Sequence, residues 1–272
     1  MTSPLAHYVA KKRRTVSGWL SRLDAEIFRA LLEYQSERRL SGSVAEIGVH
    51  EGKSFVALCL SLGQGEKAYC IDVFDNQNLN KDKSGRGDRQ KLELNLVRFG
   101  IELSRTIIDP RSSKAVTPAD IVTEVGPVRF FSIDGGHWKE IVVNDLCLAE
   151  HSIADHGIIA LDDFHRPEWP EVSMGYFSWM PEKSIVPFAI GFNKLYLCGA
   201  NWAAPYETTL REDSFVRHFF KKDVMFKGRQ IPIFQEYLLP EFSIRQRILA
   251  NVRLFKPDLY LALKVLRSRR RK

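Results

Sequence analysis

The sequence lacks the features that mark membrane-spanning, secreted and disulfide-rich proteins. It contains no run of about 18 apolar residues, so nothing in it predicts a membrane-spanning helix. The N-terminus lacks the continuous apolar core of a signal peptide, and we therefore expect a cytoplasmic protein. The four cysteines show no C-x-x-C spacing and lie in apolar runs. They are expected to be buried free thiols rather than disulfides or zinc ligands.

An evenly spread positive charge is also missing, although the formal net charge is +7. Residues 11–14 and 267–272 supply nine of the cations, and the chain between these clusters is close to neutral. A nucleic-acid-binding surface needs basic residues across a face of the fold, so we expect no nucleic-acid partner. The length of 272 residues, 44% of them hydrophobic, suffices for one large α/β domain with an appendage or for two small domains.

The most informative stretch is residues 129–165, where two apolar runs each end on acidic residues. Residues 129–133 and 157–161 are predicted to be buried β-strands, and residues 138–153 the helix between them. The first run ends on Asp134, with His137 three residues later, and the second ends on Asp162 and Asp163. Consecutive parallel strands deliver such side chains to one carboxyl-end edge, which is where open α/β sheets bind their ligands.

Three carboxylates at one edge predict a cation among them, because they otherwise repel each other. All-oxygen ligation suits a hard divalent ion such as Mg²⁺, Mn²⁺ or Ca²⁺. His137 would then be close enough to take a proton from a metal-bound hydroxyl. The plain alternative is that Asp134 and His137 cap a helix, and that Asp162 and Asp163 belong to a solvated loop. The clustering at two adjacent strand ends favours the functional interpretation.

A glycine turn follows the first predicted strand, residues 43–48, and precedes a predicted helix over residues 53–62. Gly48 allows a tight turn, and Gly52 allows a ligand to approach the helix N-terminus. The turn lacks the G-x-G-x-x-G dinucleotide pattern and is one residue short of a phosphate-binding P-loop. Glu46, in the strand end, would repel phosphate and suits a cationic or amine-bearing ligand. Asp72, which ends the next strand (residues 67–71), is suited to accept hydrogen bonds from ribose hydroxyls.

The remaining segments extend this α/β pattern. We expect helices over residues 15–40, 90–99 and 169–180, and strands over residues 104–108, 185–190 and 194–198. Residues 74–89 read as a lid or a disordered loop, and Ser112, past the third strand, would border an aromatic base. Residues 1–14 are expected to fray.

The last part of the chain differs in character from the rest. Residues 205–233 are aromatic and irregular, and residues 243–267 read as an amphipathic helix interrupted by Pro257, before the basic tail. Two interpretations of this helix remain open. It packs on its own domain or on a second subunit, which we favour, or it lies on an anionic membrane surface.

Four motifs follow one another in a recognisable order: Glu46-Ile-Gly48-Val-His50-Glu-Gly52, Asp72, Asp134-Gly-Gly-His137 and Asp162-Asp163-Phe164. This set resembles the class I S-adenosylmethionine-dependent methyltransferases, over about residues 19–198. Within that class it looks most like the TylF-like and methyltransferase family 24 metal-dependent O-methyltransferases. The resemblance implies a Rossmann-like fold with a doubly wound, mostly parallel seven-stranded sheet. The methyltransferase domain would span residues 15–200, with an N-terminal helix and a C-terminal extension over residues 201–272.

The resemblance also implies a site and a reaction. The residues around S-adenosylmethionine would be Glu46, Gly48, His50, Gly52, Asp72 and Ser112. Asp134, Asp162 and Asp163 match metal-ligand positions, with Mg²⁺ as the expected ion, and His137 matches the general base. The implied reaction is metal-assisted methyl transfer to a hydroxyl, on a vicinal diol of a small molecule such as a sugar or natural product. Two alternatives are a metal-independent methyltransferase of another acceptor and a non-catalytic module on the same fold.

Overall fold

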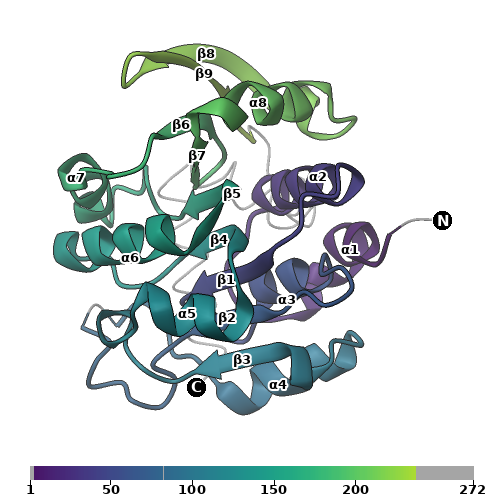
Figure 1. The fold of residues 1–272 in the computed structure, drawn as a ribbon, viewed down its shortest axis with the longest axis vertical. Coiled ribbons are helices and arrows are strands. Elements are labelled where there is room, and N and C mark those ends of the chain that lie inside the picture. Colours follow the sequence, from purple (N-terminus) through teal and green to yellow (C-terminus); the bar gives the residue numbers. More distant parts are fainter. Residues whose placement is uncertain (1–2, 82, 237–272) are drawn as a thin grey trace, which may run out of the picture. The chain divides into compact units, whose positions relative to one another are not determined.

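A nine-stranded sheet runs through the part of the chain that the computed structural model describes, residues 3–81 and 83–236 (Figure 1). The strand order is β3-β2-β1-β4-β5-β7-β6-β9-β8. Parallel pairing joins β3 (Thr106–Asp109), β2 (Ala68–Ile71), β1 (Ser43–Ile47), β4 (Val128–Ile133) and β5 (Ile153–Leu161). Next to them, β7 (Leu195–Gly199) runs antiparallel between β5 and β6 (Ile185–Ile190). The predicted doubly wound, mostly parallel sheet is confirmed.

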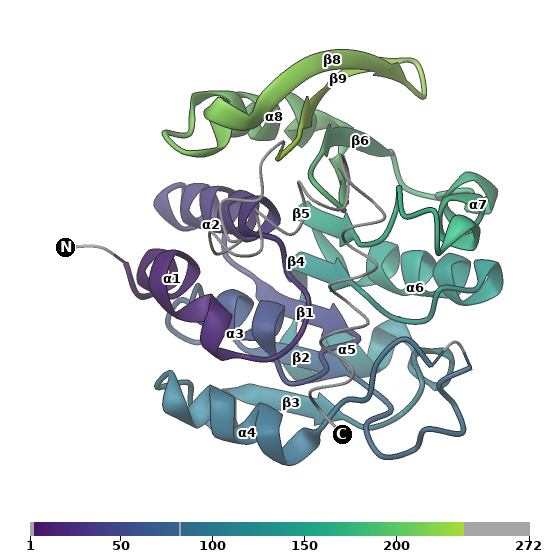
Figure 2. The same cartoon turned by 180° about the vertical axis from the view of Figure 1, so that it is seen from behind.

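The sheet has two strands more than the seven expected, and both lie in a segment for which we predicted irregular structure. β8 (Phe220–Phe226) and β9 (Arg229–Phe234) form an antiparallel hairpin, and β9 joins β6 in parallel through the pair Ile190 and Ile233 (Figure 2). Lys227 and Gly228, at the turn, both have positive φ, as tight hairpin turns require. β8 is the edge of the sheet and is largely exposed, so its sequence does not read as a buried strand.

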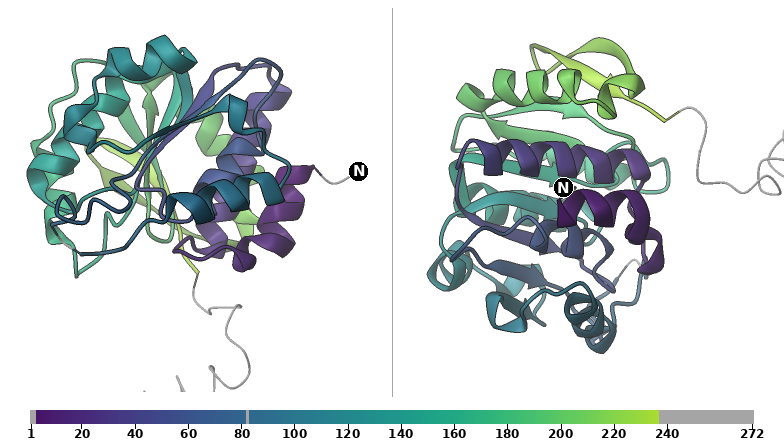
Figure 3. Two further views of the ribbon diagram at one scale, coloured as in Figure 1. Left: turned by 90° about the horizontal axis from the view of Figure 1, so that it is seen from below. Right: turned by 90° about the vertical axis from the view of Figure 1, so that its right-hand side faces the viewer.

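Helices cover both faces of the sheet (Figure 3). Each face has its own hydrophobic core, built on alternate residues of the strands. One face carries α1 (Pro4–His7), α2 (Arg22–Glu37), α3 (Lys53–Cys59), α4 (Arg89–Arg98) and α8 (Ala203–Glu212). The other face carries α5 (Pro118–Val125), α6 (Lys139–Ser152) and α7 (Pro170–Ser178). The helix α5 was not predicted; it begins with a capping box formed by Thr117 and Asp120.

The N-terminal segment is ordered, so the expectation that residues 1–14 fray is wrong for the residues described, 3–14. Leu5, Tyr8 and Val9 are buried, and the Tyr8 hydroxyl donates to the carbonyl oxygen of Lys53 at 2.7 Å. The long helix expected from residue 15 begins only at Arg22, after Ser21 caps its N-terminus. Residues 3–20 therefore pack against the turn between β1 and α3 instead of extending α2.

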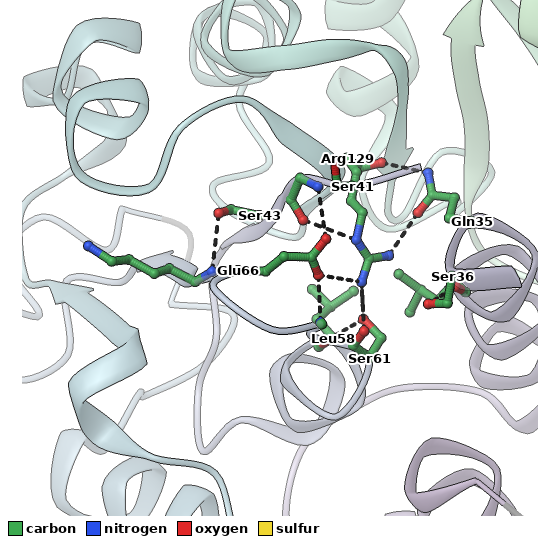
Figure 4. A network of polar contacts seen from close by, with 12 residues as sticks. Gln35, Ser36, Ser41, Ser43, Leu58, Ser61, Glu66 and Arg129 are labelled. Atoms are coloured by element: carbon green, nitrogen blue, oxygen red, sulfur yellow. Dashed lines mark hydrogen bonds and ion pairs between the residues drawn. The ribbon is translucent and has the colours of Figure 1, made fainter. Parts of the chain in front are cut away.

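A buried arginine fastens α2 to the amino end of β4 (Figure 4). Arg129 is 1% exposed, and its guanidinium donates to Gln35 Oε1 at 2.9 Å, to the Ser61 carbonyl at 2.8 Å and to the Gly42 carbonyl at 3.0 Å. The carboxylate of Glu66 lies 3.3 Å away and neutralises the charge. Buried ions persist when they are paired and fully hydrogen-bonded in this way.

The described residues up to Gln235 form one compact unit. The expected domain boundary at residue 200 falls between β7 and α8, inside this unit. The amphipathic helix predicted over residues 243–267 lies outside the described residues. In residues 3–81 and 83–236, we find no helix with both the length and the apolar character needed to cross a membrane.

Candidate active site

The sheet places four of the predicted motifs side by side. The last residues of β1, β2, β4 and β5 are in register, because Ile47 pairs with Ile71 and Ile133, and Ile133 pairs with Leu161. The residues that follow these strands, Gly48, Asp72, Asp134 and Asp162, therefore form one row at the carboxyl edge. The predicted convergence of strand ends follows directly from this register.

The turn after β1 is possible only with glycine at its first position. Gly48 has φ +80°, and a Cβ atom there would lie 1.8 Å from the carbonyl oxygen of Asp134. Gly52 caps α3 with φ +91°, and a Cβ atom would meet Leu92 Cδ1 at 2.6 Å. The backbone of the turn thus packs closely against both β4 and α4, and the N-terminus of α3 opens toward the carboxyl edge of the sheet.

Glu46 is a buried acid without a hydrogen-bond partner of good geometry among the described residues. It is 1% exposed, and both of its carboxylate oxygens are unpaired. Burial raises the pKa of Glu46 to about 7, a shift that the nearby Ser54 and Ser132 hydroxyls partly oppose. An unpaired buried carboxylate is costly by itself and suits a ligand that brings a positive charge or N–H donors.

Asp72 is held in place by the turn that it faces. Its two oxygens accept backbone N–H groups from His50 and Phe74, each at 2.8 Å. Burial raises its pKa, although these amides counteract the shift. The loop before α4 lies against the carboxylate, because a Cβ atom on Gly87 would be 2.7 Å from Asp72 Oδ1. Ser112 lies past the end of β3, where its hydroxyl caps the short turn η4 (Ser113–Ala115).

Three of the predicted catalytic and metal-binding residues converge after β4 and β5. Single ligand atoms of Asp134, His137 and Asp163 all lie within 4.8 Å of one another. His137 Nε2 lies 3.0 Å from Asp163 Oδ2, and Asp163 reaches this position through a backbone with φ +55°. A non-glycine residue in this conformation stores strain, which is common at functional sites.

Asp162 is tied into a different set of contacts. Its Oδ2 atom lies 2.5 Å from the ammonium group of Lys194, which is 2% exposed. Its Oδ1 atom accepts from Asn193 Nδ2 and from the backbone N–H of Asp163, both at 2.8 Å. Its carboxylate is therefore satisfied by protein groups.

The groups in this cluster shift one another's pKa values in opposite directions. Burial and the neighbouring carboxylate of Asp162 raise the pKa of Asp134 well above its usual range, so the neutral acid is favoured. Burial alone would raise the pKa of Asp163, but hydrogen bonds from His137 and Asn193 lower it overall. Burial alone would also lower the pKa of Lys194, and the carboxylates of Asp162 and Asp134 reverse this and raise it.

Comparison with known proteins identifies the central part of the chain. Residues 45–164, less than half of the chain, match the family model described as a methyltransferase domain. This stretch is therefore a methyltransferase domain. This range contains every residue that we predicted for the site. The prediction of a class I S-adenosylmethionine-dependent methyltransferase is thereby confirmed.

Solved structures share the fold of this methyltransferase. The O-methyltransferase NovP is 14% identical, with a TM-score of 0.54, over 65% of this chain and 79% of that one. An O-methyltransferase from Bacillus cereus, in complex with SAH, is 15% identical, with a TM-score of 0.50, over 72% of this chain and 90% of that one. The comparison with curated proteins finds no match. At such low sequence identities, the structural likeness shows only that the fold is shared.

Three residues of the candidate site were missed from the sequence. Lys194 and Asn193 contact Asp162 from the turn between β6 and β7, about 30 residues further along the chain. The indole of Trp169 stacks on the imidazole of His137, with ring centroids 4.2 Å apart. No local pattern marks these residues, because each acts across a tertiary contact.

Proposed function

We propose that this methyltransferase transfers the methyl group of S-adenosylmethionine to a hydroxyl oxygen of a small molecule, with His137 as the base. The observation that carries this proposal is the pair of His137 and Asp163, whose side chains lie 3.0 Å apart at the same sheet edge as the turn after β1, the proposed cofactor turn. An alcohol is a weak nucleophile at neutral pH, so a positioned base is needed to take its proton as the oxygen attacks the methyl group. A carboxylate bound to the imidazole orients such a base and stabilises its protonated form.

The cofactor side of the proposal assigns a role to each predicted residue. Glu46 would receive the ammonium group of the methionine part, which supplies the positive charge that its unpaired carboxylate lacks. Asp72 would bind the ribose hydroxyls, since each of its oxygens retains a lone pair beyond the backbone amide already bound. Gly48, His50 and Gly52 would line the methionine part, and Ser112 would border the adenine.

A divalent ion fits part of the expected ligand set. Asp134 and Asp163 would hold it, with His137 beside them, because their ligand atoms already lie within 4.8 Å of one another. The third expected ligand, Asp162, would first have to exchange Lys194 for the ion. A bound ion such as Mg²⁺ would lower the pKa of an acceptor hydroxyl and favour a vicinal diol, as on a sugar or natural product.

A metal-independent methyltransferase is the second candidate function. It is favoured by the ion pair of Lys194 with Asp162 and by the hydrogen bond between His137 and Asp163, which give both carboxylates a partner within the protein. In this case His137 alone would activate the acceptor, and the acceptor would not need two adjacent hydroxyls.

Methyl transfer to a catechol probe, with and without EDTA, separates the two candidates. Metal-assisted O-methylation predicts loss of activity in EDTA and its recovery with Mg²⁺ or Mn²⁺, while SAH binding stays unchanged. His137→Ala should lower the rate by about 10²- to 10⁴-fold in either case, the usual contribution of a positioned base. Full activity in EDTA would support the second candidate, and a fully active His137→Ala variant would overturn the role of the base.

A further inference from the structure

Trp169 covers one face of His137. The two rings are nearly parallel, with an interplanar angle of 14° and centroids 4.2 Å apart. The imidazole edge is held separately, by the contact between its Nε2 atom and Asp163 Oδ2. The ring therefore has one face and one edge fixed by different residues, and two such restraints leave it a single orientation.

The backbone holds Trp169 in this place. The residue precedes Pro170, which restricts its conformation, and it caps the N-terminus of α7. The backbone N–H of Trp169 donates to the carbonyl oxygen of Arg166 at 3.0 Å. This hydrogen bond closes a turn shortly after Asp162 and Asp163. Aromatic side chains have few rotatable bonds, so an indole on a fixed backbone makes a stiff support.

Two further contacts hold α7, which follows Trp169: one reaches the start of α6, just after His137, and the other reaches the loop after β5. Glu171, in the first turn of α7, accepts the backbone N–H of Lys139 at 2.9 Å, just after His137 at the start of α6. Ser173 donates to the carbonyl oxygen of Phe164, which follows the carboxylate pair. The first turn of α7 is thus joined to the start of α6, and α7 is also joined to the residue after Asp163, so the backbones that carry both stacked rings are tied together.

We propose that Trp169 is the positioning residue of His137: it fixes the plane of the imidazole, while Asp163 fixes its rotation within that plane. The proposal rests on the proposed function, since only a base that must face an acceptor hydroxyl needs this restraint. Misplacing a reacting group by about 1 Å can lower a rate about 100-fold, so loss of the stack should reduce kcat without changing cofactor binding.

The test compares Trp169→Leu, which keeps apolar bulk without a ring, with Trp169→Phe, which keeps a ring face. Trp138→Leu is the matched control, because it changes the tryptophan next to His137 that is 42% exposed. The first readout is the NMR signal of the His137 ring in protein labelled at the histidine imidazole carbons, assigned with His137→Gln. The second is kcat and KM for methyl transfer to catechol, with SAH affinity measured by calorimetry.

We expect Trp169→Leu to remove the upfield ring-current shift of His137 and to lower kcat by about 10- to 100-fold, with KM for S-adenosylmethionine and SAH affinity unchanged. Trp169→Phe should keep most of the ring-current shift and most of kcat, and Trp138→Leu should alter neither quantity. If Trp169→Leu does not fold, Glu171→Ala loosens the same junction and should show a smaller change of the same kind.

An unchanged His137 signal in Trp169→Leu, or an equal change in Trp138→Leu, would overturn the proposal. The two proposals fail separately. A wild-type protein that binds SAH but leaves catechol unmethylated argues against the proposed diol reaction, whereas the NMR comparison still decides whether Trp169 orients the imidazole.

Discussion

At the scale of single residues, the candidate site is a concentration of buried acidic groups. Asp24, Glu46 and Asp162 are each at most 7% exposed, and Lys194 is the cation that lies among them. Burial raises the pKa of Asp24 to about 6 and that of Glu46 to about 7, because a buried charge loses its hydration. Such a site gains from a ligand that brings positive charge, and S-adenosylmethionine carries both an ammonium and a sulfonium group.

The Glu46→Gln variant tests this electrostatic account through pH. Because the pKa of Glu46 is about 7 in the free protein, the carboxyl group is mostly protonated at pH 6 and mostly ionised at pH 8. An ammonium ligand binds the ionised form, so wild-type affinity for SAH should rise over this interval. The variant should bind more weakly at pH 8, by about 1–3 kcal/mol, and should lack the Glu46 contribution to the pH dependence. Calorimetry at several pH values measures both effects, and a rise of equal size in the variant would contradict the assignment.

Replacement by asparagine should have different effects at the neighbouring residues Asp162 and Asp163. Asp163→Asn should lower Mn²⁺ affinity at least about 10-fold with little loss of stability, since it removes a proposed ligand. Asp162→Asn should leave Mn²⁺ affinity nearly unchanged but lower the free energy of unfolding by about 3–5 kcal/mol, because Lys194 loses its buried partner.

Titration with Mn²⁺ and urea unfolding measure these two quantities. The reverse pattern, in which Asp162→Asn loses the ion and keeps its stability, would show that Asp162 is the ligand and that Lys194 is displaced. Absence of Mn²⁺ binding in the wild type would instead support the metal-independent candidate.

The residues that could be predicted from the sequence are those at strand ends. Gly48, Asp72, Asp134 and Asp162 each follow an apolar run directly, and parallel register alone then brings them together. Lys194 follows no such rule, because its partner lies in another turn and its surrounding sequence reads as an ordinary loop. A site built from strand ends is therefore visible in the sequence, and the groups that hold it in place are not.

At the scale of helices and strands, burial decided which elements could be predicted. The strands from β1 to β7 are apolar over most of their length and were all expected, with boundaries within a few residues. The hairpin of β8 and β9 was missed because β8 is an edge strand that carries Lys221, Lys222 and Asp223. Its place in the sheet depends on contacts of β9 with β6, which local sequence does not report.

The attachment of α2 to β4 can be tested with Arg129→Lys. Lysine keeps the charge but cannot reproduce the three directions in which the guanidinium donates, so Gln35 and the carbonyl of Ser61 lose partners inside the protein. We expect the free energy of unfolding to fall by about 3 kcal/mol, as for other broken buried networks. SAH affinity should stay unchanged, because Arg129 lies near the start of β4 and the candidate site lies at its other end. Urea unfolding and calorimetry check the two outcomes, and a stable variant with weakened SAH binding would contradict this account.

At the scale of the whole molecule, the two cores differ in what they contribute. The core beneath α2, α3, α4 and α8 supports the cofactor turn through Phe55 and Leu92, among its buried residues. The core beneath α5, α6 and α7 supports β4 and β5, after which the carboxylates and His137 follow. If the proposed roles hold, cofactor binding and activation of the acceptor depend on opposite sides of the sheet.

The buried guanidinium of Arg129 makes the matched domain depend on residues that precede it. The stretch that carries the family signature, residues 45–164, holds every predicted cofactor and catalytic residue, yet Gln35 and Gly42, two of the groups that Arg129 binds, precede it. A fragment cut to residues 45–164 would therefore contain a buried arginine without these two partners. We expect such a fragment to need α2 and the segment before β1 in order to fold, even though these residues lie outside the matched domain.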